Sequence, residues 1–168
     1  MKVIVAGSRT ISMPSLLGEV VGVSTFDITE VVSGRAKGAD QLGELWATFN
    51  NVPIKMFPAN WDAHGKKAGI MRNCVMGDYA DALIALWDGK SRGTFHMISY
   101  MLKLGKPVCV FNTTVQSYQV RRGGDPGPRP DRLRVPRRGR DGQECPGAGP
   151  GICTNLADGP GPSGSHPR

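Results

Sequence analysis

Three turns rich in glycine and basic residues each follow a short apolar run. They read AGSRT (residues 6–10), SGRAKGAD (33–40) and WDGKSRGT (87–94). Glycine lets a backbone approach a ligand closely, and the free amides at the start of a helix attract anions. Arg9, Lys37 and Arg92 add positive side chains to the same turns. The pattern predicts a phosphate-binding site, although one such turn alone also fits an ordinary tight bend.

The predicted phosphate-binding set combines these turns with a helical stretch that carries Arg72. Its members are Gly7, Ser8, Arg9, Ser33, Gly34, Arg35, Lys37, Gly38, Asp40, Arg72, Asn73, Asp88, Ser91, Arg92, Gly93 and Thr94. The glycine amides are expected to surround phosphate oxygens, while Lys37 and Arg72 supply charge. Arg72 also fits the alternative of a solvated arginine on a helix.

Asp40 and Asp88 are the acidic residues placed within the glycine-rich turns. Each can accept a hydrogen bond from a ribose hydroxyl, or can cap the amides of the following helix. They are also the candidates for a catalytic acid or base, if a reaction takes place. His64 and His96 lack partners at metal-ligand or triad spacing, so surface or capping positions are expected for both.

The segment FPANWDAHGKKAGIMRN, residues 57–73, is long for a connection in an α/β protein. Long loops of this kind often bind ligands. Trp61 in this segment can stack on a base or cover the rim of the core. We therefore expect a binding loop here, with the role of Trp61 open.

The cysteines give no sign of a metal or disulfide framework. Cys74, Cys109, Cys145 and Cys153 form no CxxC pair and have no histidine at ligand spacing. The sequence predicts neither a metal site nor a bound cofactor. No run approaches about 18 apolar residues, and the N-terminus has a strand pattern. We expect a cytoplasmic protein with no membrane partner.

Short apolar runs alternate with helical stretches, which indicates the scaffold that positions these turns. Strands are expected at 2–7, 30–34, 52–57, 80–87 and 106–111, and helices at 13–23, 38–49, 69–80 and 93–105. Continuous apolar character is typical of parallel strands covered on both faces. The alternation predicts a Rossmann-like, doubly wound α/β sheet with five main strands in the order 3-2-1-4-5. Ligands of such folds bind where the order reverses, here between the first and fourth strands.

Two of these helices have an apolar stripe that predicts their buried faces. In 38–49 the stripe is made of Leu42, Leu45, Trp46 and Phe49, and in 93–105 it is made of Ile98, Met101 and Leu102. Residues at this spacing lie on one side of a helix. Gly105 is expected to end the second helix.

The composition changes near residue 120, which predicts a folded domain at 1–115 and a tail at 116–168. Residues 121–168 contain 11 Gly and 9 Pro but no Phe, Trp or Tyr, so they cannot bury a core and are expected to be disordered. This region also has 9 Arg against 5 acidic residues. A basic tail of this kind can make weak, nonspecific contacts with nucleic acid.

The motifs AGSRTI, VVSGRAKGAD, FPANWDAHGKKAGIMRN and ADALIALWDGKSRGTFHMI occur in order, followed by a closing strand. Together they resemble the YspA/YpsA-related branch of the SLOG superfamily over about residues 1–112. That resemblance implies a Rossmann-like domain, often of phage or bacterial origin. It also implies a nucleotide-type ligand with a phosphate at the switch point. Relatives include phosphoribohydrolases of the LOG type and the single-strand-DNA-binding fold of DprA.

The sequence departs from its relatives at two positions. Where the branch usually has Gly-Gly, this chain has Gly34-Arg35, so either the turn is adjusted or the side chain of Arg35 joins the phosphate site. LOG hydrolases use a glutamate to cleave the glycosidic bond, and the equivalent residue here is Met97. A thioether cannot act as an acid or base. Hydrolysis by the LOG mechanism is therefore not expected.

Three functions remain as hypotheses at this point. The first is a sensor or sequestering module that binds a nucleotide or nucleotide-derived ligand through its phosphate. The second is hydrolysis of a nucleotide N-glycosidic bond or a nucleotide sugar, with Asp88 or Asp40 replacing the missing glutamate. The third is DprA-like binding of single-stranded DNA. A homodimer is expected only by analogy with SLOG relatives.

Overall fold

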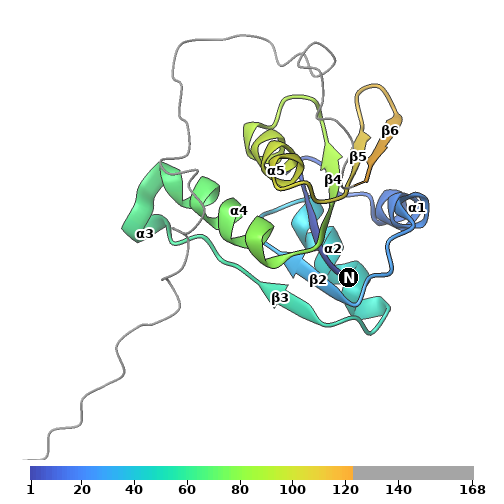
Figure 1. The fold of residues 1–168 in the computed structure, drawn as a ribbon, viewed down its shortest axis with the longest axis horizontal. Coiled ribbons are helices and arrows are strands. Elements are labelled where there is room, and N and C mark those ends of the chain that lie inside the picture. The colour runs from blue at the N-terminus through green and yellow to red at the C-terminus, as the bar shows by residue number, and fades with distance from the viewer. Residues whose placement is uncertain (123–168) are drawn as a thin grey trace, which may run out of the picture.

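The sheet has six strands, covered by helices on both faces (Figure 1). The computed structural model describes residues 1–122. The strands are β1 (Lys2–Gly7), β2 (Glu30–Ser33), β3 (Ile54–Met56), β4 (Ala82–Trp87), β5 (Val108–Asn112) and β6 (Ser117–Arg121). The helices are α1 (Pro14–Ser24), α2 (Ala39–Phe49), α3 (Trp61–His64), α4 (Ala68–Tyr79) and α5 (Arg92–Lys103), with a 3₁₀ turn at Gly65–Lys67.

The predicted doubly wound sheet is confirmed. Its order is β3-β2-β1-β4-β5-β6, and all pairs from β3 through β5 are parallel. The central pair β1 and β4 is in register from Val3 opposite Ala82 to Gly7 opposite Leu86. The turns that follow these two strands therefore begin side by side at the carboxyl edge of the sheet.

Strand β6 was not predicted. It pairs antiparallel with β5, with Asn112 opposite Ser117 and Val108 opposite Arg121. The sheet thus extends past residue 115, where composition placed the start of the tail. The predicted disorder and nucleic-acid contacts of the chain after residue 122 lie outside the described residues.

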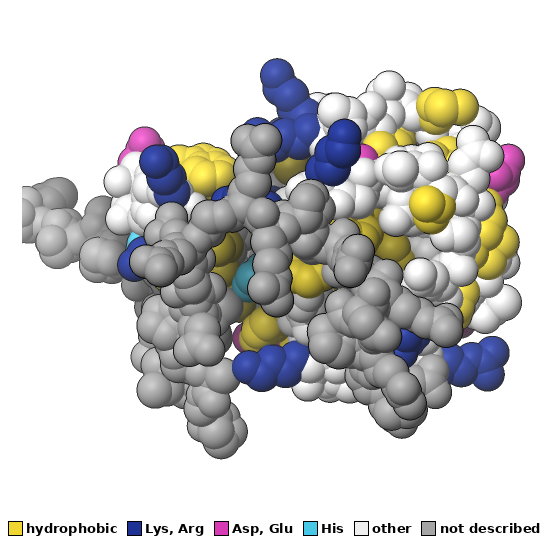
Figure 2. Space-filling model, turned by 90° about the horizontal axis from the view of Figure 1, so that it is seen from above, with side chains coloured by type: hydrophobic (Ala, Val, Ile, Leu, Met, Phe, Trp, Pro, Cys, Tyr) yellow, Lys and Arg dark blue, Asp and Glu magenta, His cyan; other side chains and the backbone are white. Residues whose placement is uncertain are grey.

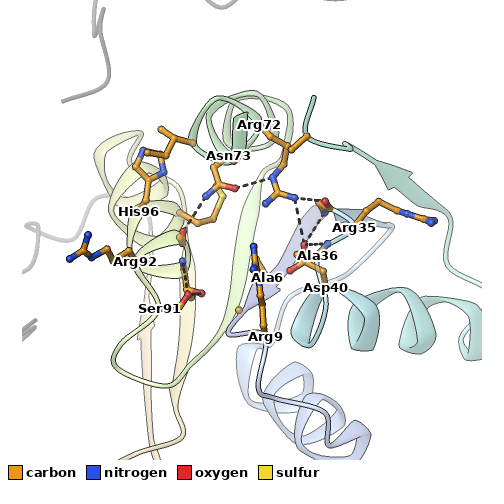
Figure 3. Close-up of a pocket in the computed structure, with 18 of the residues that line it drawn as sticks. Ala6, Arg9, Arg35, Ala36, Asp40, Arg72, Asn73, Ser91, Arg92 and His96 are labelled. Atoms are coloured by element: carbon orange, nitrogen blue, oxygen red, sulfur yellow. Dashed lines mark hydrogen bonds and ion pairs between the residues drawn. The ribbon is translucent and has the colours of Figure 1, made fainter. Parts of the chain in front are cut away.

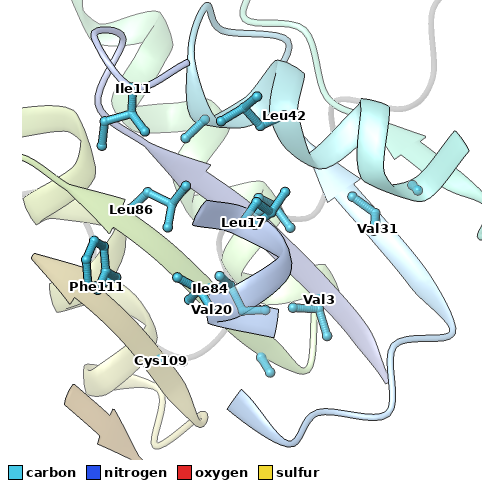
Figure 4. Packing of buried hydrophobic residues seen from close by; sticks show 14 residues of the cluster. Val3, Ile11, Leu17, Val20, Val31, Leu42, Ile84, Leu86, Cys109 and Phe111 are labelled. Atoms are coloured by element: carbon cyan, nitrogen blue, oxygen red, sulfur yellow. The ribbon is translucent and has the colours of Figure 1, made fainter. Parts of the chain in front are cut away.

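Two apolar clusters form the core, one on each face of the sheet. Side chains of α1 and α2, including Leu17, Val20 and Leu42, pack on one face (Figure 4). Side chains of α4 and α5 cover the other face, among them Met76 and Met101. Fully burying such a side chain stabilises the fold by about 1.5–3 kcal/mol. The core therefore holds the strand ends in fixed positions.

The predicted apolar stripe of α2 is wrong in part. Leu42 is buried, but Leu45 is 42% exposed and Phe49 is 79% exposed. Trp46, also in the predicted stripe, packs against the core. A Cβ atom at Gly43 would lie 2.6 Å from Cβ of Val5, so the absence of a side chain there lets α2 approach β1 closely, with Leu45 and Phe49 turned outward.

The predicted end of α5 is confirmed at Gly105. This residue has φ of 68°, and its amide donates to the carbonyl of Leu102 at 3.0 Å. The Lys106 amide donates to the carbonyl of Met101 at 3.0 Å. These two bonds form a Schellman motif, in which a left-handed glycine satisfies the last carbonyls of a helix.

Among residues 1–122, no helix has the length and apolar character that a bilayer crossing requires.

Candidate functional site

A pocket of about 940 Å³ opens at the carboxyl edge of the sheet. Its walls come from the turns after β1, β2 and β4, from the connection between β3 and α4, and from the first turns of α4 and α5. The pocket therefore lies at the β1–β4 switch point, where ligands of doubly wound folds bind. Its volume is within the range of sites for small ligands.

Most of the predicted phosphate-binding residues line this pocket. They are Gly7, Arg9, Gly34, Arg35, Lys37, Asp40, Arg72, Asn73, Asp88, Ser91, Arg92, Gly93 and Thr94. Ser8, Ser33 and Gly38 do not line it. The three separate turns and α4 thus meet at one cavity, as the parallel strands require.

Ser8 connects the first and third turns from behind the pocket. It is buried, its amide donates to the Leu86 carbonyl at 2.9 Å, and its Oγ accepts from the Asp88 amide at 3.1 Å. Gly38 connects the first and second turns, because a Cβ there would lie 2.6 Å from the Ser8 carbonyl oxygen. Both residues therefore support the pocket wall instead of facing the cavity.

Ser33 supports the second turn. Its Oγ donates to Oε1 of Glu44 at 2.6 Å and accepts from the Arg35 amide at 3.1 Å. The side chain is fully buried. Ser33 thus joins the turn to α2 and fixes the backbone from which Arg35 projects.

Arg72 joins α4 to the second turn, and only 15% of its side chain is exposed. Its Nη1 donates to the Gly34 carbonyl and lies 3.9 Å from Oδ2 of Asp40 (Figure 3). Its Nε donates to Oδ1 of Asn73 at 3.1 Å. Arg72 is therefore not a solvated helix arginine, and its Nη2 makes no hydrogen bond with residues 1–122.

Asp40 lies in the first turn of α2 and does not cap the amides of that helix, but binds amides of the turn before it. Its Oδ2 accepts from the amides of Gly34 at 3.2 Å and Ala36 at 3.3 Å. Burial raises the pKa of Asp40 to about 6, although Arg72 and these two amides act in the opposite direction. Burial also lowers the pKa of Arg72, while Asp40 raises it and Arg9 lowers it.

The basic side chains around the pocket differ in direction. Arg9 extends toward Arg72 in Figure 3, whereas Arg35 and Arg92 extend outward on opposite sides. Within residues 1–122, Arg9, Lys37 and Arg92 form no ion pair with an acidic side chain. Their charges are therefore not neutralised by the described part of the chain.

Arg35 adopts a backbone conformation that favours glycine, with φ of 59°. Arg35 therefore occupies a left-handed position, which a glycine would adopt without strain. Nη1 of Arg35 lies 4.0 Å from Oε2 of Glu44 and 3.2 Å from Sδ of Met56. The side chain lines the pocket edge and is 53% exposed.

Asp88 and Ser91 shape the turn that leads into α5. The Oδ1 atom of Asp88 accepts from the amides of Lys90 at 2.9 Å and Ser91 at 2.8 Å. Burial acts to raise the pKa of Asp88, but these amides and the Ser8 hydroxyl outweigh it and lower the pKa. Ser91 caps α5 by accepting from the Thr94 amide at 3.4 Å.

Asn73 holds the first turn of α5 against α4. It is buried, and its Nδ2 donates to the Gly93 carbonyl at 3.1 Å while its Oδ1 accepts from Arg72. The opposite orientations of its two bonds fix the amide plane. Asn73 therefore connects the second and third turns through Arg72.

Several pocket residues were not in the predicted set. They are Ala6, Thr10, Ala36, Pro58, Ala59, Trp61, Lys66, Gly69, Ile70, Met76, His96 and Met97. The length of the segment 57–73 was the signal for those between Pro58 and Ile70. His96 was expected at a surface or capping position, yet it lines the pocket from α5.

Metal-binding side chains do not gather here. Among the described residues, no group of three or more His, Cys, Asp or Glu side chains is placed to hold a metal ion. The lining includes basic side chains, the carboxylates of Asp40 and Asp88, and the glycine-rich turns.

The chain belongs to the YspA, cpYpsA-related SLOG family, whose family model matches residues 1–64. It is similar to the Gene 61 protein of Mycobacterium phage D29, with 41% identity over 88 residues. That match covers 48% of this chain and 70% of the phage protein. The matched family segment contains two of the three glycine-rich turns.

The fold is also similar to that of DNA processing protein A (DprA) from Streptococcus pneumoniae, in an X-ray structure. The TM-score is 0.54 at 20% sequence identity. The match covers 65% of this chain and 49% of DprA, so the chain spans about half the length of that protein. At this identity the likeness concerns the fold.

Proposed function

We propose that the protein binds a nucleotide or nucleotide-derived ligand through its phosphate, as a sensor or sequestering module. The observation that carries the proposal is the convergence of Arg9, Lys37 and Arg72 on one pocket. These residues come from the turn after β1, the turn after β2 and helix α4. An anion in the pocket would offset the repulsion among them.

The charge of the pocket supports an anionic ligand. Six basic side chains line it, from Arg9, Arg35, Lys37, Lys66, Arg72 and Arg92, against the acidic Asp40 and Asp88. Asp40 is buried beside Arg72 and can be neutral near pH 6. Several separate Lys and Arg side chains are visible on the face seen in Figure 2. A phosphate or pyrophosphate group matches this arrangement.

The backbone adds a second attraction for phosphate. Helix α5 begins at Arg92, and its first residues, Arg92, Gly93 and Thr94, line the pocket. The amides at the start of a helix favour an anion by about 0.3–1 kcal/mol. Membership of the SLOG family also supports a nucleotide-related function.

The state of three residues supports ligand binding over hydrolysis. Met97, at the position of the catalytic glutamate of LOG enzymes, is buried and lines the pocket. Asp40 is engaged by two backbone amides and lies beside Arg72. Asp88 accepts from two amides and has a lowered pKa, so it is a poor proton donor near neutral pH.

Calorimetry on the full-length protein tests this function. ADP-ribose, NAD, a cyclic dinucleotide, ATP and GTP are titrated, and at least one is expected to bind with a Kd near 1 μM, about −8 kcal/mol. Lys37→Ala and Arg9→Ala are expected to weaken that binding about tenfold each. Lys103→Ala, at the far end of α5, is the matched control and should leave the affinity unchanged. Flat traces for all five ligands would contradict the proposal.

Single-stranded DNA is a competing ligand in the same experiment. Electrostatic binding to a DNA backbone weakens steeply as salt increases. A nucleotide held by a few contacts in a pocket is expected to depend much less on salt. The wild type could bind single-stranded DNA tightly and bind no nucleotide, with the DNA binding abolished in Lys37→Ala. That result would identify DNA, and not a nucleotide, as the ligand of the pocket.

A further inference from the structure

The connection between β3 and α4 and the start of α4 contribute polar residues to the pocket, namely Lys66, Arg72 and Asn73. They also contribute five apolar residues, Pro58, Ala59, Trp61, Gly69 and Ile70. We call these five residues the tryptophan shelf. A phosphate group gains no favourable contact from apolar surface, so these residues suit a different, less polar part of a ligand.

Trp61 is unusually accessible for its type. Trp61 is 53% exposed, whereas Trp87 is 3% exposed and Trp46 packs against the core. Large aromatic side chains are normally buried to a high degree. Trp61 therefore does not serve mainly to cover the core, which was one of the two roles that the sequence left open.

Two local features position Trp61, one at the backbone of its turn and one beside its ring. Asn60 caps α3 by accepting from the Ala63 amide at 3.0 Å, which fixes the turn on which Trp61 lies. A Cβ atom at Gly69 would lie 3.3 Å from Cη2 of Trp61. Gly69 thus allows the ring to lie against the first turn of α4, and Trp61 lines the cavity.

We infer that the tryptophan shelf is a base-binding subsite, in which a nucleobase stacks on Trp61 while the phosphate lies among Arg9, Lys37 and Arg72. This inference rests on the proposed function and names the ligand class more narrowly. The site takes nucleotides and selects them over phosphosugars. Purines bind more tightly than pyrimidines, because their larger ring system covers more of the indole.

Size and charge agree with this division of the pocket. A cavity of about 940 Å³ is much larger than a phosphate group and has room for a nucleotide. Lys66 is exposed, lines the pocket and carries the positive charge nearest in sequence to Trp61 among the pocket residues. Stacking on an aromatic side chain strengthens nucleotide binding by roughly ten- to a hundredfold.

The test compares ligands that share a phosphoribosyl group and differ in the base. The full-length protein is titrated with AMP, UMP, ribose 5-phosphate and ADP-ribose by calorimetry. Trp61→Ala is expected to weaken AMP and ADP-ribose binding about tenfold or more and to leave ribose 5-phosphate unchanged. Trp61→Phe keeps an aromatic face and is expected to restore most of the affinity. Phe49→Ala removes an exposed aromatic residue outside the pocket and should change nothing.

Fluorescence gives a second readout that does not depend on affinity alone. Stacking of a purine is expected to quench the emission of the wild-type protein, and the quenching should vanish in Trp61→Ala, where Trp46 and Trp87 remain. Equal losses for AMP and ribose 5-phosphate in Trp61→Ala, or no loss for either, would overturn the subsite and leave the phosphate proposal standing. Failure of the wild-type protein to bind any of these four ligands would overturn the subsite, and flat traces for NAD, the cyclic dinucleotide, ATP and GTP as well would overturn the proposed function too.

Discussion

The guanidinium of Arg72 lies against the backbone of Gly34, where no other residue type leaves room for it. Nη1 donates to the Gly34 carbonyl, and a Cβ atom on Gly34 would overlap the guanidinium. The same Nη1 lies 3.9 Å from Oδ2 of Asp40. The turn after β2 and helix α4 are therefore connected through one largely buried cation. Gly34 serves the site by its missing side chain, in addition to any contact with a ligand.

The first prediction concerns this buried pair. Arg72→Met leaves Asp40 buried without its counter-charge, so the free energy of unfolding should fall by about 3 kcal/mol at pH 7. Combining it with Asp40→Asn removes the uncompensated charge and should recover part of the loss. Urea unfolding of the wild type, both single variants and the double variant measures the coupling. Strictly additive changes would show that the two side chains do not interact.

The second prediction follows from the raised pKa of Asp40. This pKa is about 6 in the folded protein against 3.8 for the free side chain, so the folded state binds the proton more tightly. Protonated Asp40 therefore stabilises the folded state. This stabilisation is fully present below pH 3.8 and is lost as the pH rises through 6. As the pH falls from 7 to 5, the free energy of unfolding of the wild type should rise by on the order of 1 kcal/mol relative to that of Asp40→Asn.

Urea unfolding at pH 7, 6 and 5 checks this dependence. The lowered pKa of His96 acts in the opposite direction, because burial disfavours its charged form. Both proteins contain His96, so the difference between them isolates Asp40. An identical pH dependence in the wild type and Asp40→Asn would show that Asp40 does not titrate in this range.

The third prediction concerns the left-handed backbone of Arg35. A non-glycine residue at φ of 59° costs about 1 kcal/mol or more, and the ion pair with Glu44 at 4.0 Å is solvent-exposed and weak. Arg35→Gly should therefore raise the free energy of unfolding by roughly 0.5–1 kcal/mol. It should also weaken binding of an anionic ligand by removing a charge from the pocket edge. A variant less stable than the wild type would show that the side-chain contacts outweigh the backbone cost.

The fourth prediction concerns Lys106, far from the pocket. Its Nζ donates to the carbonyls of Gly77, Asp78 and Ala80 at the end of α4, at 2.7, 3.0 and 2.7 Å. Lys106→Met should lower the free energy of unfolding by about 1–2 kcal/mol, because these carbonyls lose a cationic donor. Thermal and urea unfolding measure the loss. Lys103→Met, on an exposed position of α5, should change stability by less than about 0.5 kcal/mol.

The sequence was sufficient to predict where the pocket would form. Parallel strands place their carboxyl ends at one edge, so the turns that contain Arg9, Lys37 and Asp88 had to meet once the strand order was known. The glycines marked the turns because their backbones approach other groups closely. At Gly38 that group is the Ser8–Arg9 backbone.

The sequence did not contain the information for side-chain partners and helix faces. Leu45 and Phe49 have the spacing of a buried stripe, but the close approach of Gly43 to Val5 rotates them outward. The ion pair between Arg72 and Asp40 joins residues 32 positions apart, which spacing alone cannot reveal. Strand β6 is short and partly polar, so no apolar pattern marked it.

The last prediction joins the buried pair to ligand binding. Protonation of Asp40 near pH 6 removes the negative charge beside Arg72, which leaves the arginine more attractive to an anion. ADP-ribose is the suitable probe, because its pyrophosphate diester has no proton to gain near pH 6, unlike a phosphate monoester. Its affinity should increase a few-fold as the pH falls from 7 to 5, with uptake of protons on binding. In Asp40→Asn the affinity should already be high at pH 7 and should change little with pH. If the wild type instead loses affinity on acidification while the variant behaves in the same way, the Asp40–Arg72 pair does not control the charge that the ligand meets.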